Sequence, residues 1–378
     1  MNFKNIKKYL KKNYKFVIII CLFLFLIMTN NIINIKIFEN YKNDHEAGHL
    51  NTFGPGKKPH SIRIDTNKFP KVKDIAKISS EVPPPLNRTT PTRVNITLTT
   101  VEVISEIAPG ISYHYWTFNK TVPGPFLRVL QGDIINITIK NVKTNSHNHS
   151  IDLHASWAPG GGAGPLSPVG EIKPGESKSF EFKALIPGLY VYHCASPNVP
   201  THIANGLYGM ILVEPPKGLS KVDKEFYIVQ GELYTKGEIG EKGYQEFDPQ
   251  KMIDERPEYI VFNGRTGALK DHALQAKVGD KVRIYFGNMG NTKISSFHVI
   301  GAIFDKVYSE GSLTSIKTGV QTTLVPAGGA TIVEMTMRVP GTFVLVDHAL
   351  ARIERGAWGL FTVKGNDQPS IFKALKKK

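Results

Sequence analysis

The chain has 378 residues, of which 41% are hydrophobic and 10% aromatic, enough for substantial cores in two domains of ordinary size. Its two cysteines, Cys21 and Cys194, exclude a disulfide-stapled scaffold, and no Cys-x-x-Cys-His motif is present to attach a c-type haem. The net charge of +15 is raised by lysines at both ends, without the interleaved basic and aromatic residues of nucleic-acid-binding proteins, so we expect no nucleic-acid partner.

Residues 1–38 predict an export signal or a membrane anchor. Six lysines precede the apolar run 16–28, whose length fits the core of a signal peptide better than a full membrane span of about 20 residues. No small-residue cleavage site follows, so a removed signal and an uncleaved anchor both stay open, while the bulky Ile20 disfavours a lipid on Cys21. We expect an exported, periplasmic protein, anchored in the membrane through its N-terminus if that segment is retained.

The remaining chain predicts an all-β fold. Residues 39–90 are polar and turn-rich and predict a tether, and 367–378 form a basic tail. Between them, short runs alternate apolar with polar residues, as at Ile135, Ile137 and Ile139, and are separated by Gly, Pro and Asn. This period of two is typical of β-strands with one buried face.

An internal repeat predicts two copies of one β-sandwich. Three markers recur in the same order, roughly 150 residues apart. The pairs are Gly132-Asp133 and Gly279-Asp280, the segments 187–194 and 340–348, and the segments 206–213 and 356–363. We expect one domain at 91–216 and a second at 224–366, the second without a cysteine in the matching strand.

Cys194 predicts a copper–thiolate centre. It lies in Tyr192-His193-Cys194-Ala195, and His202 follows eight residues later. A cysteine and a loop histidine at this short spacing are typical of mononuclear copper sites that transfer single electrons. Because neighbouring strand residues point to opposite faces, His193 and Cys194 predict two metal sites joined by one peptide bond.

Strand parity sorts the other candidate ligands of the first copy. His149 and His154 differ by five positions and should face opposite ways, whereas Asp152 and His154 should share a face. The simplest assembly therefore has two groups: His149, Cys194 and His202 in one, and Asp152, His154 and His193 in the other.

The second group lacks a third imidazole. Three protein ligands are the usual count for a catalytic metal site with an open position. The second copy offers His298 and His348, and the repeat places His348 at the position of the ligand strand of the first copy. A structural role for each of these histidines is the alternative.

Taken together, these motifs resemble those of the copper-containing nitrite reductases, in particular their two-domain neisserial outer-membrane type. They cover about 91–364 and are jointly highly specific. The matching segments are His149-Ser-Ile-Asp-Leu-His-Ala155, Tyr192-His-Cys-Ala195, His202-Ile-Ala-Asn-Gly206, Phe262-Asn-Gly264, Gly267-Ala-Leu269, Ser295-Ser-Phe-His-Val-Ile-Gly301 and Val346-Asp-His348.

The resemblance implies two tandem cupredoxin-like Greek-key domains, a homotrimer, and one type 1 and one type 2 copper per subunit. The implied ligands are His149, Cys194 and His202 for type 1 copper, and His154, His193 and His348 for type 2 copper. Each type 2 site would lie between two subunits, with the last histidine supplied by the neighbour.

The resemblance also implies a reaction and its residues. Asp152 and His298, the latter again from the neighbour, match the acid–base pair of the catalytic site, and Ile300 matches the apolar residue that shapes the nitrite pocket. Dissimilatory reduction of nitrite by one electron would yield nitric oxide. An external c-type cytochrome or small cupredoxin would supply the electron.

One position departs from the family pattern. The family has an axial methionine five residues after the loop histidine, and this chain has Leu207 there. We expect Met210, three residues further on, to be a core residue. Without a thioether, the type 1 site should be three-coordinate and have a raised reduction potential.

Two other functions stay open. A membrane-tethered cupredoxin electron carrier would retain only the thiolate centre and hold one copper per subunit instead of two. A two-domain multicopper oxidase would need several His-x-His pairs for a trinuclear cluster, and the chain contains one, His147-Asn-His149.

Overall fold

The structure is a computed structural model that describes residues 64–375. The predicted signal or anchor at 1–38, the tether up to residue 63 and the last three residues of the basic tail lie outside the described residues. Within 64–375, no helix is long and apolar enough to cross a membrane. Strands dominate this part of the chain, so the predicted all-β fold is confirmed.

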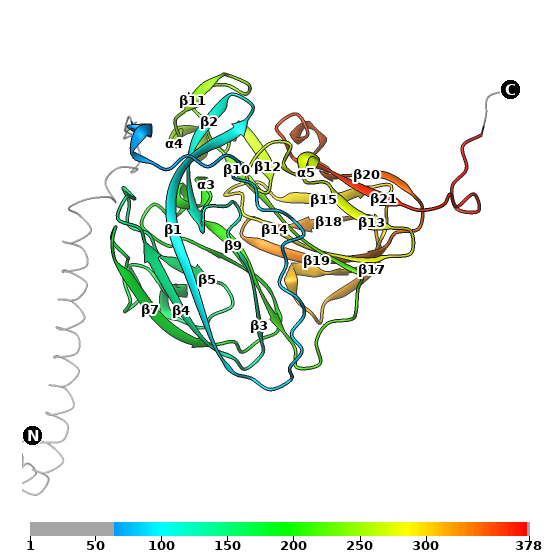
Figure 1. Cartoon of the computed structure of the whole chain (residues 1–378), viewed down its shortest axis with the longest axis horizontal. Coiled ribbons are helices and arrows are strands. Elements are labelled where there is room, and N and C mark those ends of the chain that lie inside the picture. Colours follow the sequence, from blue (N-terminus) through cyan, green and yellow to red (C-terminus); the bar gives the residue numbers. More distant parts are fainter. Residues whose placement is uncertain (1–63, 376–378) are drawn as a thin grey trace, which may run out of the picture. The chain divides into compact units, whose positions relative to one another are not determined.

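Two sheets contain the first copy of the predicted repeat (Figure 1). One has the strand order β11-β2-β1-β4-β7 and the other the order β3-β9-β8-β5-β6. Their bounds are β1 (Arg93–Ala108), β2 (Ile111–Phe118), β3 (Phe126–Leu130), β4 (Ile134–Asn141), β5 (Ile151–Leu153), β6 (Gly162–Ala163), β7 (Ser177–Lys183), β8 (Gly188–His193), β9 (Tyr208–Glu214) and β11 (Gly243–Gln245).

Two further sheets contain the second copy. Their orders are β12-β10-β14-β19-β16-β17 and β13-β21-β20-β15-β18. Their bounds are β10 (Lys224–Leu233), β12 (Tyr259–Phe262), β13 (Leu274–Lys277), β14 (Lys281–Asn288), β15 (Ser295–Ile300), β16 (Phe304–Tyr308), β17 (Ile316–Val320), β18 (Thr322–Val325), β19 (Gly329–Thr336), β20 (Gly341–Asp347) and β21 (Trp358–Lys364).

Helices are short and lie in the connections. Among residues 64–375, the α-helices are α3 (Val199–Ala204), α4 (Pro249–Ile253) and α5 (Ala268–Asp271). The 3-10 turns of the same part of the chain are η2 (Thr66–Lys68), η3 (Pro159–Gly161), η4 (Ser309–Gly311) and η5 (Leu350–Arg352).

The two pairs of sheets repeat one connectivity. The order β2-β1-β4-β7 corresponds to β12-β10-β14-β19, and β3-β9-β8-β5 corresponds to β13-β21-β20-β15. In both copies the central strand pair is parallel, β1 with β4 and β10 with β14. β11 crosses the predicted division, because it belongs to the second copy in sequence but pairs with β2. The domain boundaries themselves stay a prediction.

Alternating burial builds the core of each copy. Along β4, Ile135, Ile137 and Ile139 are fully buried while their neighbours face outward, as the period of two predicts. These isoleucines pack in one cluster with Cys194 and Leu207. A second cluster fills the other copy, and a third joins strands of both copies. Cys194, one of the candidate metal ligands of the first copy, is thus part of a closely packed apolar core.

The last part of the predicted tether is packed against the folded body. Ile75 is fully buried, and Val72 and Lys77 donate backbone hydrogen bonds to Ile104 and Val122. Asp74 forms a two-pronged ion pair with Arg265 of the second copy. Residues 64–90 therefore contact both copies of the repeat. They do so through backbone hydrogen bonds, the buried side chain of Ile75 and the ion pair of Asp74.

Candidate metal centres

The first donor group, the thiolate group, consists of His149, Cys194 and His202. Its three residues lie in or next to connections between strands of the first copy. His149 follows β4, Cys194 follows β8, and His202 lies on α3. Cys194 Sγ is 3.3 Å from His202 Nδ1 and 4.0 Å from His149 Nδ1, and the two Nδ1 atoms are 3.3 Å apart. All three side chains are buried.

This geometry fits a metal ion. A point equidistant from the three donor atoms lies about 2 Å from each, which is the length of a metal–nitrogen bond and slightly short of a metal–sulfur bond. One thiolate with two imidazoles in a plane is the donor set that copper takes in electron-transfer sites. The donor atoms and their spacing are therefore those of a trigonal copper–thiolate site.

The surroundings favour the thiolate form of Cys194. Burial acts to raise the pKa of the thiol, but the hydrogen bond with His149 and backbone N–H groups outweigh it, so the pKa lies below its ordinary value. The N–H of Ser150 donates to Cys194 Sγ at 3.3 Å. A thiolate is the form that binds a metal.

The ligand loop is held by its own hydrogen bonds. Asn198 caps α3, accepting from the Thr201 hydroxyl at 2.8 Å. Leu207 closes the loop, because its N–H donates to the His202 carbonyl and its carbonyl accepts from the Cys194 N–H. His202 is thereby fixed relative to Cys194.

The structure confirms Met210 as a core residue. Met210 belongs to the cluster that joins the two copies, and a Cβ on Gly287 would lie 2.5 Å from its Sδ. Leu207 is fully buried in the cluster around Cys194, and that cluster contains no methionine among residues 64–375.

The second group lies on the neighbouring strands β5 and β8. Asp152 and His193 are directly opposed in the antiparallel pair, and His154 follows the end of β5. The Nε2 atoms of His154 and His193 are 3.2 Å apart, and Asp152 Oδ2 is 4.0 Å and 3.9 Å from them. Two imidazole nitrogens that bind one ion at about 2 Å and a tetrahedral angle are about 3.3 Å apart, so this pair also fits a metal.

The tautomer of His193 is set by its neighbour. His193 Nδ1 lies 2.9 Å from the Cys194 carbonyl, to which it donates, so that Nε2 carries the lone pair. Burial, followed by the electrostatic interaction with the neighbouring imidazole of His193, lowers the pKa of His154, which favours the neutral form that binds a metal. The side chains of Asp152 and His154 are 31% and 38% exposed, so the group opens to the surface.

His298 and His348 form a separate pair on the second copy. Their rings lie on β15 and directly after β20 with centroids 5.4 Å apart. With Ser296, Gln321 and Thr322 they line a hollow of about 270 Å³. His298 Nδ1 donates to the Gln321 carbonyl at 2.6 Å. Among the described residues, neither histidine joins the Asp152 group within this chain.

Ile300 shares the face of β15 that carries His298, because the two residues are two positions apart. Its side chain is largely exposed in this chain. Ile300 is not among the residues that line the hollow, and its role in shaping a nitrite pocket stays a prediction.

Glu102 is a residue near the thiolate group that sequence reasoning missed. It lies on β1, fully buried, with Oε1 3.3 Å from His149 Nε2. Burial acts to raise the pKa of Glu102, but its interactions with His114, His147 and His149 outweigh it and hold the pKa well below its ordinary value. Thr100 and Glu106 share the face of β1 that carries Glu102, so the sequence pattern did not distinguish Glu102 from a solvent-facing carboxylate.

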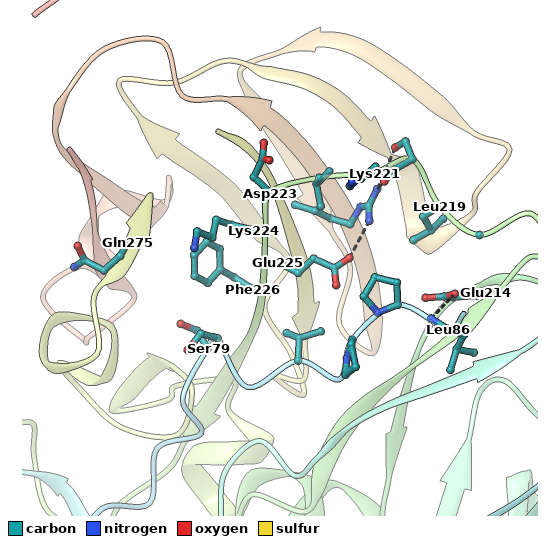
Figure 2. A pocket seen from close by; sticks show the side chains of 18 of the residues that line it. Ser79, Leu86, Glu214, Leu219, Lys221, Asp223, Lys224, Glu225, Phe226 and Gln275 are labelled. Atoms are coloured by element: carbon teal, nitrogen blue, oxygen red, sulfur yellow. Dashed lines mark hydrogen bonds and ion pairs between the residues drawn. The ribbon is translucent and has the colours of Figure 1, made fainter. Parts of the chain in front are cut away.

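A larger hollow lies elsewhere on the protein. It has a volume of about 870 Å³ and runs between residues 78–87 and 214–226 (Figure 2). Two of its carboxylates are engaged: Glu225 pairs with Arg283 at 2.9 Å, and Glu214 accepts a hydrogen bond from the Leu86 N–H. None of the candidate metal ligands lines it.

Comparison with known proteins gives consistent similarities. A family model described as multicopper oxidase matches residues 101–218. The copper-containing nitrite reductase of Neisseria meningitidis serogroup A is 48% identical over 305 residues, covering 80% of this chain and 78% of the relative. That of Alcaligenes faecalis is 35% identical and covers 68% and 72%. The solved structure of copper nitrite reductase from Nitrosomonas europaea superposes with a TM-score of 0.64 at 34% identity, covering 73% of this chain and 96% of that one.

Proposed function

Because the chain belongs to the copper-containing nitrite reductases, we propose that it carries out dissimilatory reduction of nitrite by one electron and two protons to nitric oxide and water. Its fold is the all-β cupredoxin-like fold of these proteins. The observation that carries the proposal is the pair of donor groups whose members His193 and Cys194 are adjacent in the chain.

Each subunit would hold one type 1 and one type 2 copper. His149, Cys194 and His202 would bind the type 1 copper. His154 and His193 would occupy two coordination positions of the type 2 copper. Bound copper supplies a one-electron redox couple and a Lewis acid for an oxygen ligand. The single peptide unit between His193 and Cys194 is the shortest covalent connection between the two groups.

We further propose a homotrimer in which the second group is completed by His348 of the partner subunit. Two features support this: the Asp152 group has two imidazoles among the described residues, and the hollow with His298 and His348 faces outward on the same chain. The measurement is light scattering of the copper-loaded protein, with an expected mass three times the 42.0 kDa of one chain. A fully active monomer would contradict it.

Asp152 and His298 would supply the protons. Asp152 Oδ2 lies 4.0 Å and 3.9 Å from the two metal-binding Nε2 atoms, at the open side of the group. His298 is held by its Nδ1 hydrogen bond, which leaves Nε2 directed to other partners. A carboxylate and an imidazole are the side chains that exchange protons near neutral pH. Ile300 would limit the room for substrates larger than nitrite.

The electron would come from a c-type cytochrome or a small cupredoxin in the periplasm, with the chain held at the membrane by its N-terminal segment. The electron-carrier and oxidase alternatives are not favoured, since the relatives reported above are nitrite reductases. A carrier would also have no use for the Asp152 group.

Leu207→Met should lower the reduction potential of the thiolate centre. A thioether five residues after His202 would add the axial ligand that favours Cu(II). The swap conserves volume and should cost less than about 1.5 kcal/mol of stability. Redox titration of the visible absorption measures the potential. An unchanged potential would mean that residue 207 does not face the copper.

The function itself is tested by incubating the copper-loaded chain, in detergent and without oxygen, with nitrite and an artificial one-electron reductant. We expect nitrite to be consumed and nitric oxide to be released in equal amounts. A protein that holds two coppers per subunit and leaves nitrite unchanged would rule the proposal out.

A further inference from the structure

Glu102 lies at the centre of a buried cage of N–H groups next to the thiolate group. Oε1 accepts from the backbone N–H groups of Ser146 and His147 at 3.0 Å and 2.9 Å. The same oxygen is 3.1 Å from His147 Nδ1 and 3.3 Å from His149 Nε2. Oε2 faces His114 Nε2 at 3.3 Å. Oε1 therefore has four nitrogen atoms around it, whereas Oε2 faces His114 Nε2 without forming a hydrogen bond, and the carboxylate has no exposure to water.

This contact assigns the two nitrogens of His149. Nδ1 faces Cys194 Sγ and His202 Nδ1, whereas Nε2 faces Glu102. With Nδ1 bound to a metal, Nε2 carries the proton and donates it to the carboxylate. A carboxylate that accepts from a ligand imidazole orients the ring and makes it a stronger electron donor.

Trp116 packs against the histidines around Glu102 and the thiolate group. Its ring packs against those of His147, His149 and His202, with centroids 4.2, 5.6 and 4.6 Å away. Asn145 fixes the loop from the other side, because its side chain accepts from the Glu102 N–H at 2.8 Å. The carboxylate cannot turn away from His149 without breaking these contacts, so its position relative to the ligand is built into the fold.

The negative charge opposes the effect of Leu207. An apolar axial residue favours Cu(I) and raises the potential of the thiolate centre. A buried carboxylate on a ligand imidazole favours the more highly charged Cu(II). A centre with the leucine alone would accept electrons readily but pass them on poorly.

We propose that Glu102 is a positioning residue that lowers the reduction potential of the thiolate centre through its contact with His149, offsetting the absence of an axial methionine at Leu207. This inference rests on the copper site of the proposed function. It assigns the tuning of the centre to a residue 47 positions before the ligand, on a different strand.

The test is Glu102→Gln, with the potential measured by redox titration of the visible absorption at pH 8. Glutamine keeps the shape and one acceptor oxygen but removes the charge. Loss of a carboxylate that accepts from a ligand imidazole weakens metal binding by about 10–100-fold. We expect this loss to affect the affinity for Cu(II) and to leave the affinity for Cu(I) unchanged. For a one-electron couple this is an upward shift of about 59–118 mV. An unchanged or lowered potential would overturn the proposal.

Asp133→Asn is the matched control. Asp133 is also fully buried, is bound by Arg88 and the backbone N–H of Leu130, and lies at the opposite end of β4 from the ligand loop. Its loss should leave the potential unchanged. An equal upward shift in the control would show that the effect is a general loss of packing, and would also overturn the proposal.

A second measurement needs no variant. In the diamagnetic Cu(I) form of the unaltered protein with ¹⁵N-labelled histidine, NMR should show a slowly exchanging Nε2–H proton of His149 shifted downfield by the carboxylate. Absence of that proton overturns the inference even if Glu102→Gln does not fold. Absence of thiolate–copper absorption in the unaltered protein would instead refute the copper site of the proposed function.

Discussion

Asp152→Asn should lower the rate of nitrite reduction by about 10²–10⁴-fold, the range that one proton-transfer group contributes. The amide keeps the shape of the side chain next to His154 and His193 but cannot release a proton near neutral pH. The thiolate group lies on the other face of the strands, so its visible absorption should not change. The measurement is steady-state nitric oxide release alongside the visible spectrum.

Asp305→Asn is a suitable control for that variant. Asp305 is a partly exposed carboxylate of the second copy that accepts from Thr336 and pairs with Arg338. The control should retain the rate. If Asp152→Asn also retained it with both coppers bound, Asp152 would not be the proton donor.

Cys194→Ser should abolish the visible absorption, reduce the copper content from two to one per subunit, and stop turnover with any donor that delivers electrons at the thiolate centre. Cys194 is the one cysteine of residues 64–375, since Cys21 lies in the N-terminal segment. A serine hydroxyl is not deprotonated near neutral pH and is not a soft donor for copper. Metal analysis and anaerobic activity measure both effects.

Met210→Leu is the control for the cysteine variant. This substitution removes the sulfur atom of Met210, which lies three residues after the axial position at Leu207. The Met210 side chain packs between the two copies. Spectrum, copper content and rate should all be retained, at a cost in stability below about 1.5 kcal/mol. Loss of the absorption in this control, with Cys194 intact, would contradict the assignment of Met210 to the core.

Strand parity could predict the two donor groups because the relevant strands are regular. His149, Asp152, His154, His193 and Cys194 occupy the faces that a period of two assigns to them. Asp152 and His193 are opposed on β5 and β8, and the backbone hydrogen bonds of His154 and Cys194 continue the strand register past the strand ends, so local sequence was sufficient. The same rule predicted the buried isoleucines of β4.

Glu102 could not be placed in the same way. Its partners belong to β2 and to the loop after β4, and nothing in the sequence near Glu102 indicates which loop it meets. The partners of residues 64–90 could not be predicted for the same reason, since Asp74 pairs with Arg265 about 190 positions away. Contacts between distant segments depend on the assembled fold, whereas the alternation along one strand does not.

The glycine-rich segment at residues 159–165 packs against Asp152 of the second donor group. Gly161 has a φ of +69° and passes so close to Asp152 that a Cβ there would lie 1.9 Å from Oδ1. Gly162 similarly passes the ring of Phe180. These glycines permit the backbone to run against the carboxylate, and any side chain at position 161 would displace it.

The central claim is that the thiolate group and the Asp152 group act as one electron-transfer unit on nitrite. The most direct test is to reduce the copper-loaded protein fully, remove excess reductant, and mix it with nitrite without oxygen in a stopped-flow spectrometer. The account predicts that the thiolate–copper absorption returns and that nitric oxide appears, with one molecule per electron lost. A protein that holds two coppers per subunit, stays colourless and releases no nitric oxide would contradict it.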